Sequence, residues 1–419
     1  MLTCGALACG GAPSDAAHGG AWGFARVLRL EHPSLRAQST DYSGSARPAA
    51  PATTLAPTSE AEAAWMGGAH RVRRLRASSA ASPASHAGLA CGVYAITGGL
   101  GGLGLRAAAL LVAGGARGVV LASRSGRVVR DGQGVAARLE SAGAAGVLVA
   151  SDGADAHEAS ALVCVWPLVG VLHAAGVLRD RMLRAMSADD VHASYAPKAE
   201  GAALLHFVAT RGLEAFGLFS SVASTFGNVG QANYAAANAY LDALASSRRH
   251  GGTVGSSLQI PAVSGAGMGA TTFGEAQLEA MGAVSLDEFA ACLGAVLAAG
   301  RAASEQTQAP LCPGALVSVA IPALSELCQH RDTKITPLGA PAATQTAGIG
   351  IDPSLAHLAP LQRHAHVESA VLRVVRELTA ASLTAEAPLM EAGVDSLAAT
   401  ELSSRLRALT GVALSPTIV

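Results

Sequence analysis

Three side chains in the stretch 219–240, FSSVASTFGNVGQANYAAANAY, have the types and the spacing to act on a carbonyl group. Ser221 comes first, Tyr234 follows thirteen residues later, and Asn238 lies four residues beyond the tyrosine. We predict a strand that ends at Ser221, a loop that contains glycine, and a helix that carries the other two. Residues at i and i+4 share one face of a helix. Ser221 would face that side across the cleft where ligands bind in open α/β sheets.

A tyrosine can protonate a developing alkoxide if its anion is stabilised, because an unperturbed phenol has a pKa of about 10. A lysine ammonium within about 4 Å contributes roughly 4 kcal/mol at an effective dielectric constant near 20, which equals about three pKa units. The candidate is Lys198, in YAPKAEGAALLH, while the hydroxyl of Ser221 can hydrogen-bond the carbonyl oxygen. The alternative is that the serine and the tyrosine are ordinary loop and helix residues and that Lys198 is a solvated surface cation.

A glycine-rich turn upstream favours the catalytic interpretation. The strand-like run GVYAIT leads into GGLGGLG and then into the helix-like run LRAAALLVAGGA. Gly99, Gly101 and Gly104 match the dinucleotide-binding fingerprint, in which glycines let the backbone approach a pyrophosphate at a helix N-terminus. The fingerprint alone is weak, but its place between a strand and a helix supports it. The residues predicted to contact the cofactor here are Gly98, Gly99, Leu100, Gly101, Gly102 and Leu103.

The residues about twenty positions after this turn indicate which dinucleotide binds. NAD sites place a carboxylate there to hold the ribose hydroxyls, whereas this chain has Ser123 and Arg124. A guanidinium suits a 2′-phosphate, so the sequence predicts NADPH. The alternative is that Arg124 only caps a strand.

Three further positions complete the predicted cofactor site. Asp152, after the third strand, can accept a hydrogen bond from the adenine amine. Ala174 and Gly176 belong to the sequence HAAG at the end of the fourth strand, and their small size would let the cofactor lie close. We interpret His173, in the same motif, as a structural residue rather than a proton donor.

Strands that alternate with helices from residue 92 onward predict an α/β fold with a Rossmann-like doubly wound parallel sheet. The other strand-like runs are GVVLAS, GVLVAS, LVGVLHAAG, EAFGLFSS and SSLQIPAV. We assign residues 89–330 to this NADP-binding catalytic domain.

Residues 1–88 are expected to be the remnant of a further domain with low-complexity segments. The run AWGFARVLRLEHPSL predicts an amphipathic helix. Four apolar side chains would share its buried face: Trp22, Val27, Leu28 and Leu30. No strand-rich core precedes this helix in the sequence, so we expect the front half of the domain to be absent. The run AWMGGAHRVRRLRA predicts one short strand.

The C-terminal part predicts a small all-α domain after a linker. Residues 331–360 are rich in Pro, Ala, Gly and Thr without a clear period, as linkers are. In 361–419, HVESAVLRVVRELTA and SLAATELSSRLRALTG carry apolar residues at helical spacing. Ser396 follows Asp395 at the start of the second helix, where a phosphodiester would lie at the positive end of the helix. The alternative is an ordinary Asp-Ser N-cap.

Charge and composition argue against several classes of function. Lys+Arg number 29 and Asp+Glu number 30, so neither nucleic acid nor an anionic membrane surface is an expected partner. The longest uncharged runs are too short or too broken by proline to span a bilayer, and the N-terminus does not predict a signal peptide. Seven cysteines without CxxC spacing favour reduced thiols, no zinc site and a cytoplasmic location.

Together, these motifs resemble the ketoreductase of a modular (type I) polyketide synthase followed by an acyl-carrier domain. TGGLGGLG, LASRSG, HAAGVLRD, APKAEGAALLH, FSSVAS and GQANYAAANAYLDALA look like the catalytic half of such a ketoreductase. AWGFARVLRLEHPSL looks like the end of its structural half, and GVDSLAATEL looks like the phosphopantetheine attachment motif. The most specific point is an exchange: ordinary short-chain dehydrogenases carry Tyr-x-x-x-Lys, whereas here Asn238 follows Tyr234 and the lysine is upstream at Lys198.

The resemblance implies NADPH-dependent reduction of a carrier-bound β-ketoacyl thioester to a β-hydroxyacyl thioester in polyketide, or related fatty acid, biosynthesis. By similarity, Tyr234 donates the proton, Ser221 orients the carbonyl, and Lys198 lowers the tyrosine pKa. Asn238 would hold the proton relay. Ser396 would carry 4′-phosphopantetheine, added by a phosphopantetheinyl transferase. The implied partners are other synthase domains in the same or an adjacent chain.

The resemblance also implies a stereochemical outcome. Asp180 lies where the B-type members of the family keep the aspartate of an LDD motif, with Arg179 in place of the middle aspartate. Phe226 stands where the other type has tryptophan. The product implied is a hydroxyl of D configuration.

Two other functions stay open from the sequence. One is a stand-alone NADPH-dependent dehydrogenase that acts on free ketones, against which the GVDSL motif argues. The other is a scaffold and carrier module in which the ketoreductase fold does not reduce anything. Since the carrier domain would stop at Val419 before its last helices, we expect a C-terminally truncated carrier in a fragment of a larger multienzyme.

Overall fold

The structure is a computed structural model of the 419-residue chain. It describes residues 1–6, 15–43, 60–66, 69–72, 89–127, 134, 144–209, 212–272, 274–280, 283–305, 369, 372–373 and 376. The chain divides into two units, Met1–Thr333 and Lys334–Val419, and each is treated by itself. The described residues of the second unit are helical. The predicted linker at 331–360 and the predicted attachment site at Ser396 lie outside the described residues.

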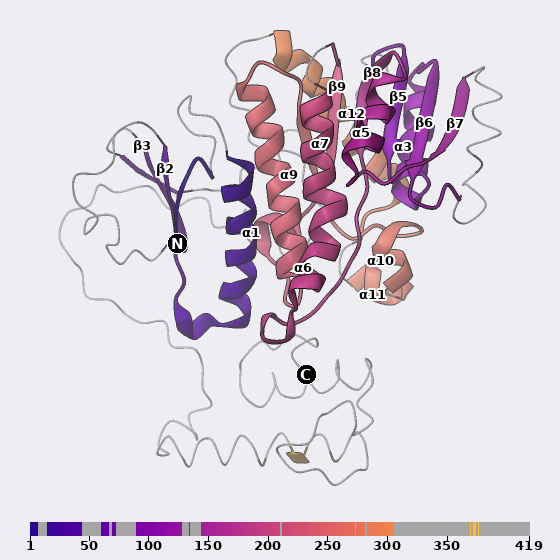
Figure 1. Cartoon of the computed structure of the whole chain (residues 1–419). Coiled ribbons are helices and arrows are strands. Elements are labelled where there is room, and N and C mark those ends of the chain that lie inside the picture. The colour runs from indigo at the N-terminus through magenta and orange to yellow at the C-terminus, as the bar shows by residue number, and fades with distance from the viewer. Residues whose placement is uncertain are drawn as a thin grey trace, which may run out of the picture. The chain divides into compact units, whose positions relative to one another are not determined.

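The larger sheet has six strands, all parallel, in the order β10-β9-β8-β5-β6-β7 (Figure 1). Its strands are β5 (Val93–Thr97), β6 (Gly118–Ser123), β7 (Ala145–Ala150), β8 (Leu168–His173), β9 (Ala215–Ser221) and β10 (Ser256–Ile260). The prediction of a doubly wound parallel sheet is therefore confirmed. The chain runs outward from β5 to β7 and then returns to the other side of β5. This makes the β5–β8 pair the switch point, outside whose carboxyl ends ligands bind in such sheets.

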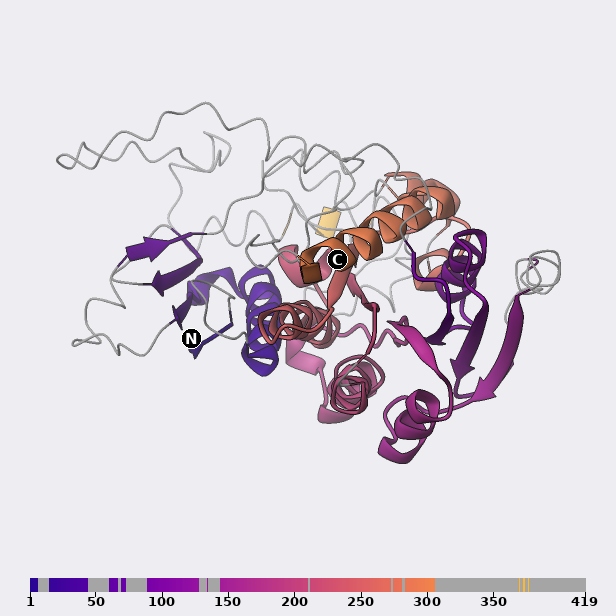
Figure 2. The same cartoon turned by 90° about the horizontal axis from the view of Figure 1, so that it is seen from above.

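Helices cover both faces of this sheet, as the view from above shows (Figure 2). On one face lie α3 (Gly102–Ala113) and α12 (Leu286–Glu305), which contact each other. On the other lie α5 (Ala156–Cys164), α7 (Gly201–Val208) and α9 (Ala232–His250). The shorter helices are η1 (Pro33–Leu35), η3 (Leu183–Ala185), α6 (Ala188–Tyr195), η4 (Ala196–Glu200), α8 (Ala223–Phe226), α10 (Gly267–Thr272) and α11 (Glu275–Ala280). Among the described residues, no helix is long and apolar enough to cross a membrane.

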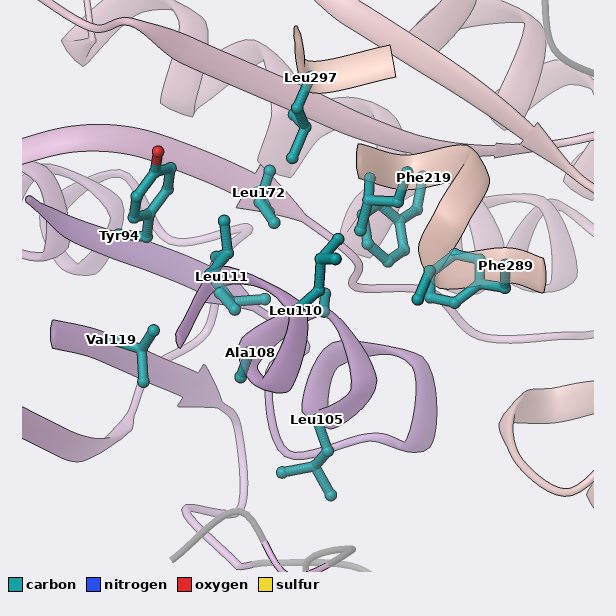
Figure 3. Packing of buried hydrophobic residues seen from close by; sticks show 14 of the residues in the cluster. Tyr94, Leu105, Ala108, Leu110, Leu111, Val119, Leu172, Phe219, Phe289 and Leu297 are labelled. Carbon is teal, nitrogen blue, oxygen red and sulfur yellow. The ribbon is translucent and has the colours of Figure 1, made fainter. Parts of the chain in front are cut away.

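The main core lies between the sheet and the α3–α12 layer (Figure 3). Leu111 of α3 and Leu172 of β8 are completely buried there. The rings of Phe219 and Phe289 meet edge to face with their centres 5.6 Å apart, which joins β9 to α12. A parallel sheet that is covered on both faces explains why its strands read as nearly continuous apolar runs.

A second sheet lies beside the N-terminal helix, in a region where the sequence predicted one short strand. Its four strands, β1 (Leu2–Cys4), β2 (Ser39–Ser43), β3 (Glu62–Met66) and β4 (Ala69–Arg71), lie in that order. Only β1 precedes the helix α1 (Ala16–Glu31) in the sequence, and the other three strands follow it. The three-residue β1 pairs with a strand far along the chain, and such short, distant pairings leave no periodic pattern in the sequence.

The helix α1 packs on α9, the helix that carries Tyr234 (Figure 1). Glycines of α1 make this close approach possible, since a Cβ added at Gly23 would lie 2.7 Å from the Cβ of Ala239. Trp22 faces the small sheet, where its indole N–H donates to the hydroxyl of Thr3 at 2.9 Å. Of the four side chains predicted to share the buried face of α1, Trp22 and Val27 are buried and Leu28 is half-buried, whereas Leu30 is 46% exposed.

Candidate active site

Ser221, Tyr234, Asn238 and Lys198 come together beside the carboxyl end of β9. Ser221 is the last residue of β9, and Tyr234 is the third residue of α9. The ammonium nitrogen of Lys198 lies 5.4 Å from the centre of the Tyr234 ring, and it donates to the carbonyl of Phe219 at 2.8 Å. The structure therefore brings Lys198 from upstream to the serine and the tyrosine of the stretch 219–240.

A π-helical turn, η4, positions Lys198 between α6 and α7. Such turns are rare and occur frequently at functional sites. The lysine side chain is only 3% exposed, and this burial lowers its pKa to about 7, against the opposing charge of Asp242. A Cβ at Gly176 would lie 2.8 Å from the Lys198 Cε. Gly176 was predicted from cofactor contact, and it also leaves room for the lysine.

His173 holds the turn that carries the lysine. Its Nε2 lies 2.8 Å from the carbonyl oxygen of Lys198, and since a carbonyl only accepts, Nε2 must donate. Nδ1 is then the acceptor for the Thr97 hydroxyl at 2.7 Å. The imidazole is completely buried, and this desolvation lowers its pKa to about 4, helped by the charge of Lys198. A neutral histidine thus connects the end of β5 with the lysine turn, consistent with the structural role predicted for it.

Two opposing effects act on the pKa of Tyr234. Burial raises the pKa of its phenol, while hydrogen-bond interactions with the Asn238 and Ser221 side chains lower it. The Asn238 amide donates to the Tyr234 carbonyl at 2.8 Å, and its buried Oδ1 has no partner among the described residues. The Ser221 oxygen accepts from the Ala223 N–H at 3.2 Å, which leaves the hydroxyl proton available to donate.

Asp242, which the sequence analysis did not single out, ties three elements around this site. Its carboxylate accepts from the Ser224 hydroxyl at 2.6 Å, from the Ser257 hydroxyl at 2.5 Å and from the Gln259 amide at 2.7 Å. These bonds join α9 to α8 and β10. The available signal was that Asp242 follows Tyr234 by two helical turns in a run that is otherwise rich in alanine.

The glycine turn lies at the switch point of the sheet. Gly98 has a φ of +67°, and a Cβ there would lie 2.7 Å from the backbone carbonyl carbon of Ala174. The Ala174 N–H donates to the Thr97 carbonyl at 2.9 Å. Gly101 is the N-cap of α3. The small residues after β8 are thus packed directly on the turn after β5, and a side chain at Gly98 would separate them.

The neighbouring strand ends place the other predicted cofactor residues on the same edge. Ser123 ends β6 and pairs with Ala150 of β7. The hydroxyls of Ser123 and Ser151 are buried and have no partner among the residues that the structure describes, and Arg124 is exposed. A glycine turn at a helix N-terminus, these two buried hydroxyls and an exposed guanidinium along one edge fit a phosphorylated dinucleotide. Asp152 follows β7, and its carboxylate accepts from the Ala154 N–H at 3.1 Å.

Asp180 lies at the start of the helix that carries the tyrosine. Its carboxylate accepts from the side-chain amide of Gln231 at 2.8 Å, and Gln231 is the N-cap of α9. Asn233 reaches the same loop by donating to the carbonyl of Arg179 at 2.8 Å. The loop that contains Asp180 is therefore fastened three residues before Tyr234.

The fold and its glycine turn define a Rossmann-like domain of the short-chain dehydrogenase/reductase type. Comparison with known proteins makes the class more specific. Residues 92–265 match the family model described as KR domain, and residues 369–419 match the one described as phosphopantetheine attachment site. The chain belongs to the ketoreductase family of polyketide synthases, and it continues into a phosphopantetheine attachment region.

Individual relatives agree with this assignment. The ketoreductase from the first module of phoslactomycin biosynthesis in a Streptomyces species is 32% identical, with a TM-score of 0.64 and 71% of each chain covered. A structure of A-type ketoreductases from a modular polyketide synthase is 33% identical, with a TM-score of 0.65, and covers 72% of this chain and 66% of that one. The spectinabilin polyketide synthase system protein NorA′ of Streptomyces orinoci is 34% identical over 442 residues, which covers 100% of this chain and 12% of that protein. The chain thus spans a small part of the curated relatives that it matches.

Proposed function

We propose that this chain reduces a carrier-bound β-ketoacyl thioester to the β-hydroxyacyl thioester with NADPH, as one step of polyketide biosynthesis. The observation that carries this proposal is the Lys198 ammonium 5.4 Å from the centre of the Tyr234 ring, beside the strand that ends at Ser221. Reduction of a ketone needs a proton donor for the oxygen and a hydrogen-bond donor that orients it. Tyr234 and Ser221 supply these two groups.

The roles of the side chains follow from their contacts. Ser221 donates its hydroxyl proton to the substrate carbonyl, and Tyr234 gives its phenolic proton to the oxygen as negative charge develops there. The ammonium of Lys198 favours the phenolate that results, which counteracts the increase in pKa caused by burial. The buried Oδ1 of Asn238 has no partner among the described residues. It would accept a hydrogen bond from a donor in the relay that returns a proton to the tyrosine.

NADPH would supply the hydride. The residues that would hold it lie on the carboxyl edge of the sheet: Gly98, Gly99, Leu100, Gly101, Gly102, Leu103, Ser123, Arg124, Asp152, Ala174 and Gly176. Arg124 would contact the 2′-phosphate, because a guanidinium can form a bidentate pair with phosphate oxygens. This pairing would select NADPH over NADH.

The substrate class follows from the attached region. The phosphopantetheine attachment model covers Ser396, and we propose that a phosphopantetheinyl transferase loads this serine so that the arm presents the thioester. Other polyketide synthase domains, in the same or an adjacent chain, would be the partners. Asp180, held by Gln231 beside the tyrosine helix, would set the D configuration of the product, as in the B-type members that the sequence resembles.

An NADPH oxidation assay tests the proposed reaction. The full chain, given NADPH and a β-ketoacyl N-acetylcysteamine thioester, should consume NADPH and form the β-hydroxyacyl thioester. Tyr234→Phe removes only the phenolic oxygen, so we expect a decrease in kcat of at least about 100-fold from loss of the general acid, with NADPH binding retained. Equal rates for the two proteins would contradict the mechanism.

A further inference from the structure

We propose that Glu31, on the N-terminal helix α1, is a positioning residue for the substrate: its carboxylate fastens the two loops that flank Tyr234 in the geometry that selects the β-ketoacyl group. This inference rests on the proposed function. It assigns a role in substrate selection to a residue from outside the Rossmann-like domain.

The carboxylate of Glu31 accepts two backbone N–H groups, one from the first residue of η3, directly after the loop 174–182, and one from the loop before α9. One oxygen accepts from the Leu183 N–H at 2.6 Å, and the other accepts from the Gly230 N–H at 2.9 Å. Glu31 is the last residue of α1, and these partners lie 152 and 199 residues further along the chain. A single side chain therefore spans both loops, and each of its oxygens is used.

Glu31 adds to other restraints on these loops, such as the Asn233 amide that donates to the Arg179 carbonyl at 2.8 Å. Residues 174–182 belong to no helix or strand, so their backbone groups lack the regular partners that a ladder or helix supplies. Gly230 has a φ of +78°, and its carbonyl accepts from the Arg181 N–H at 2.8 Å. Gly230 thus bonds Glu31 through its N–H and the other loop through its carbonyl, which places Glu31 at the junction of the two loops.

This junction directly adjoins the side chains that we assign to the substrate. Asp180 precedes Arg181, and Gln231 follows Gly230. The side-chain amide of Gln231 donates a hydrogen bond to the Asp180 carboxylate at 2.8 Å. Gln231 is also the N-cap of α9. A shift of Gly230 would therefore move Asp180 relative to the helix that carries Tyr234, while the glycine turn on the other side of the site would keep its own bonds.

Packing on α1 adds to this restraint. A Cβ at Gly227 would lie 2.9 Å from the Leu30 Cδ1 and 3.2 Å from the backbone of Arg26. The loop from Gly227 to Gly230 therefore rests on the last turns of α1. Glu31 supplies the polar part of the same contact.

The test variant is Glu31→Gln in the full chain. Gln has nearly the same shape, but it offers one accepting oxygen and turns an amide N–H₂ toward the second backbone N–H. We expect faster amide hydrogen exchange at Leu183 and Gly230. With an α-methyl-β-ketoacyl N-acetylcysteamine thioester, we expect KM to increase about tenfold, kcat to change less than about threefold, and the product diastereomer ratio to fall toward unity. NADPH affinity should be unchanged.

Glu62→Gln is the matched control. Glu62 is likewise a carboxylate of the N-terminal region, and it accepts from the Arg26 guanidinium at 2.7 Å and from Arg29. This variant should lower the melting temperature and leave KM and the diastereomer ratio as in the wild type. The same loss of selectivity in both variants would reduce Glu31 to general support of α1 and overturn the proposal.

The remaining outcomes are also decisive. Faster amide hydrogen exchange in Glu31→Gln, together with wild-type KM and a wild-type diastereomer ratio, would show that Glu31 stabilises the loops without affecting substrate selection. That result would overturn the inference while the proposed function stands. A wild-type chain that binds NADPH but does not reduce the thioester would overturn both.

Discussion

At the scale of single residues, the site contains a buried lysine whose charged form destabilises the folded state. Lys198 is 3% exposed, and a buried ammonium is costly unless it is compensated. Its described partners are the Phe219 carbonyl and, at longer range, the charge of Asp242. The incomplete compensation is what lowers the lysine pKa to about 7, and it keeps the amine able to exchange a proton near neutral pH.

This gives a prediction for stability as a function of pH. The pKa of Lys198 is 10.5 in the unfolded chain, whereas burial lowers this pKa to about 7 in the folded chain. Between these values the unfolded state binds more protons, so stability rises with pH. Relative to Lys198→Met, wild-type protein should gain up to about 1.4 kcal/mol per pH unit between about pH 7 and 9. Urea unfolding of both proteins without nucleotide measures it; a pH-independent difference would show that the lysine titrates normally.

At the scale of elements, the position of Tyr234 depends on how closely α1 and α9 approach. The helix α9 is largely alanine along the contact, and α1 presents Gly19, Gly20 and Gly23 to it. Glycine destabilises an isolated helix by roughly 0.5–1 kcal/mol relative to alanine, so its use here is explained by the backbone contact that it permits. The tyrosine helix is thus held from behind by a helix that the catalytic motifs do not include.

Replacing a glycine of α1 by alanine at this contact should therefore lower the unfolding free energy, whereas the same replacement in a helix with free space should raise it. Gly23→Ala would place a Cβ 2.7 Å from that of Ala239, and we expect a loss of about 1–3 kcal/mol in unfolding free energy from overpacking. The control is Gly294→Ala in α12, whose Cβ would meet nothing nearer than 3.8 Å. It should stabilise by up to about 1 kcal/mol. Chemical denaturation compares them; destabilisation of equal size in both would contradict the packing argument.

At the scale of the whole chain, two units match two different families. The ketoreductase match, 92–265, lies within Met1–Thr333, and the phosphopantetheine attachment match, 369–419, lies within Lys334–Val419. In the proposed function, a carrier tethered to the reductase in one chain would raise the effective concentration of its substrate. The two units should also be separable by mutation, since each family supplies its own reactive residue.

Loading of the carrier provides that test. Incubation with coenzyme A and a phosphopantetheinyl transferase should add one phosphopantetheine arm to the wild type and to Tyr234→Phe, and none to Ser396→Ala. Intact-protein mass spectrometry reads all three. Conversely, Ser396→Ala should still reduce a free thioester at the wild-type rate. A chain in which Tyr234→Phe prevents loading would show that the two units are not independent.

Local patterns were sufficient for the parallel sheet and for the list of candidate residues, because both leave short-range marks. A glycine turn between a strand and a helix, and a tyrosine four residues before an asparagine, are visible within a few positions of the chain. The six predicted strands were found for the same reason. By contrast, β1 has three residues and pairs with β2 after an intervening helix, so nothing in its neighbourhood indicated a sheet.

The contacts that hold the site in place were decided by the tertiary structure alone. His173 beneath the lysine turn, Asp242 between three elements and Glu31 across two loops each act over distances in sequence that no periodicity reports. Their partners, which are side chains for Asp242 and include backbone groups for His173 and Glu31, become neighbours only when the chain has folded, and that is a property of three-dimensional packing. Residue types and spacing determined which chemistry is available, whereas folding determined the burial, and hence the proton affinities, of the groups that perform it.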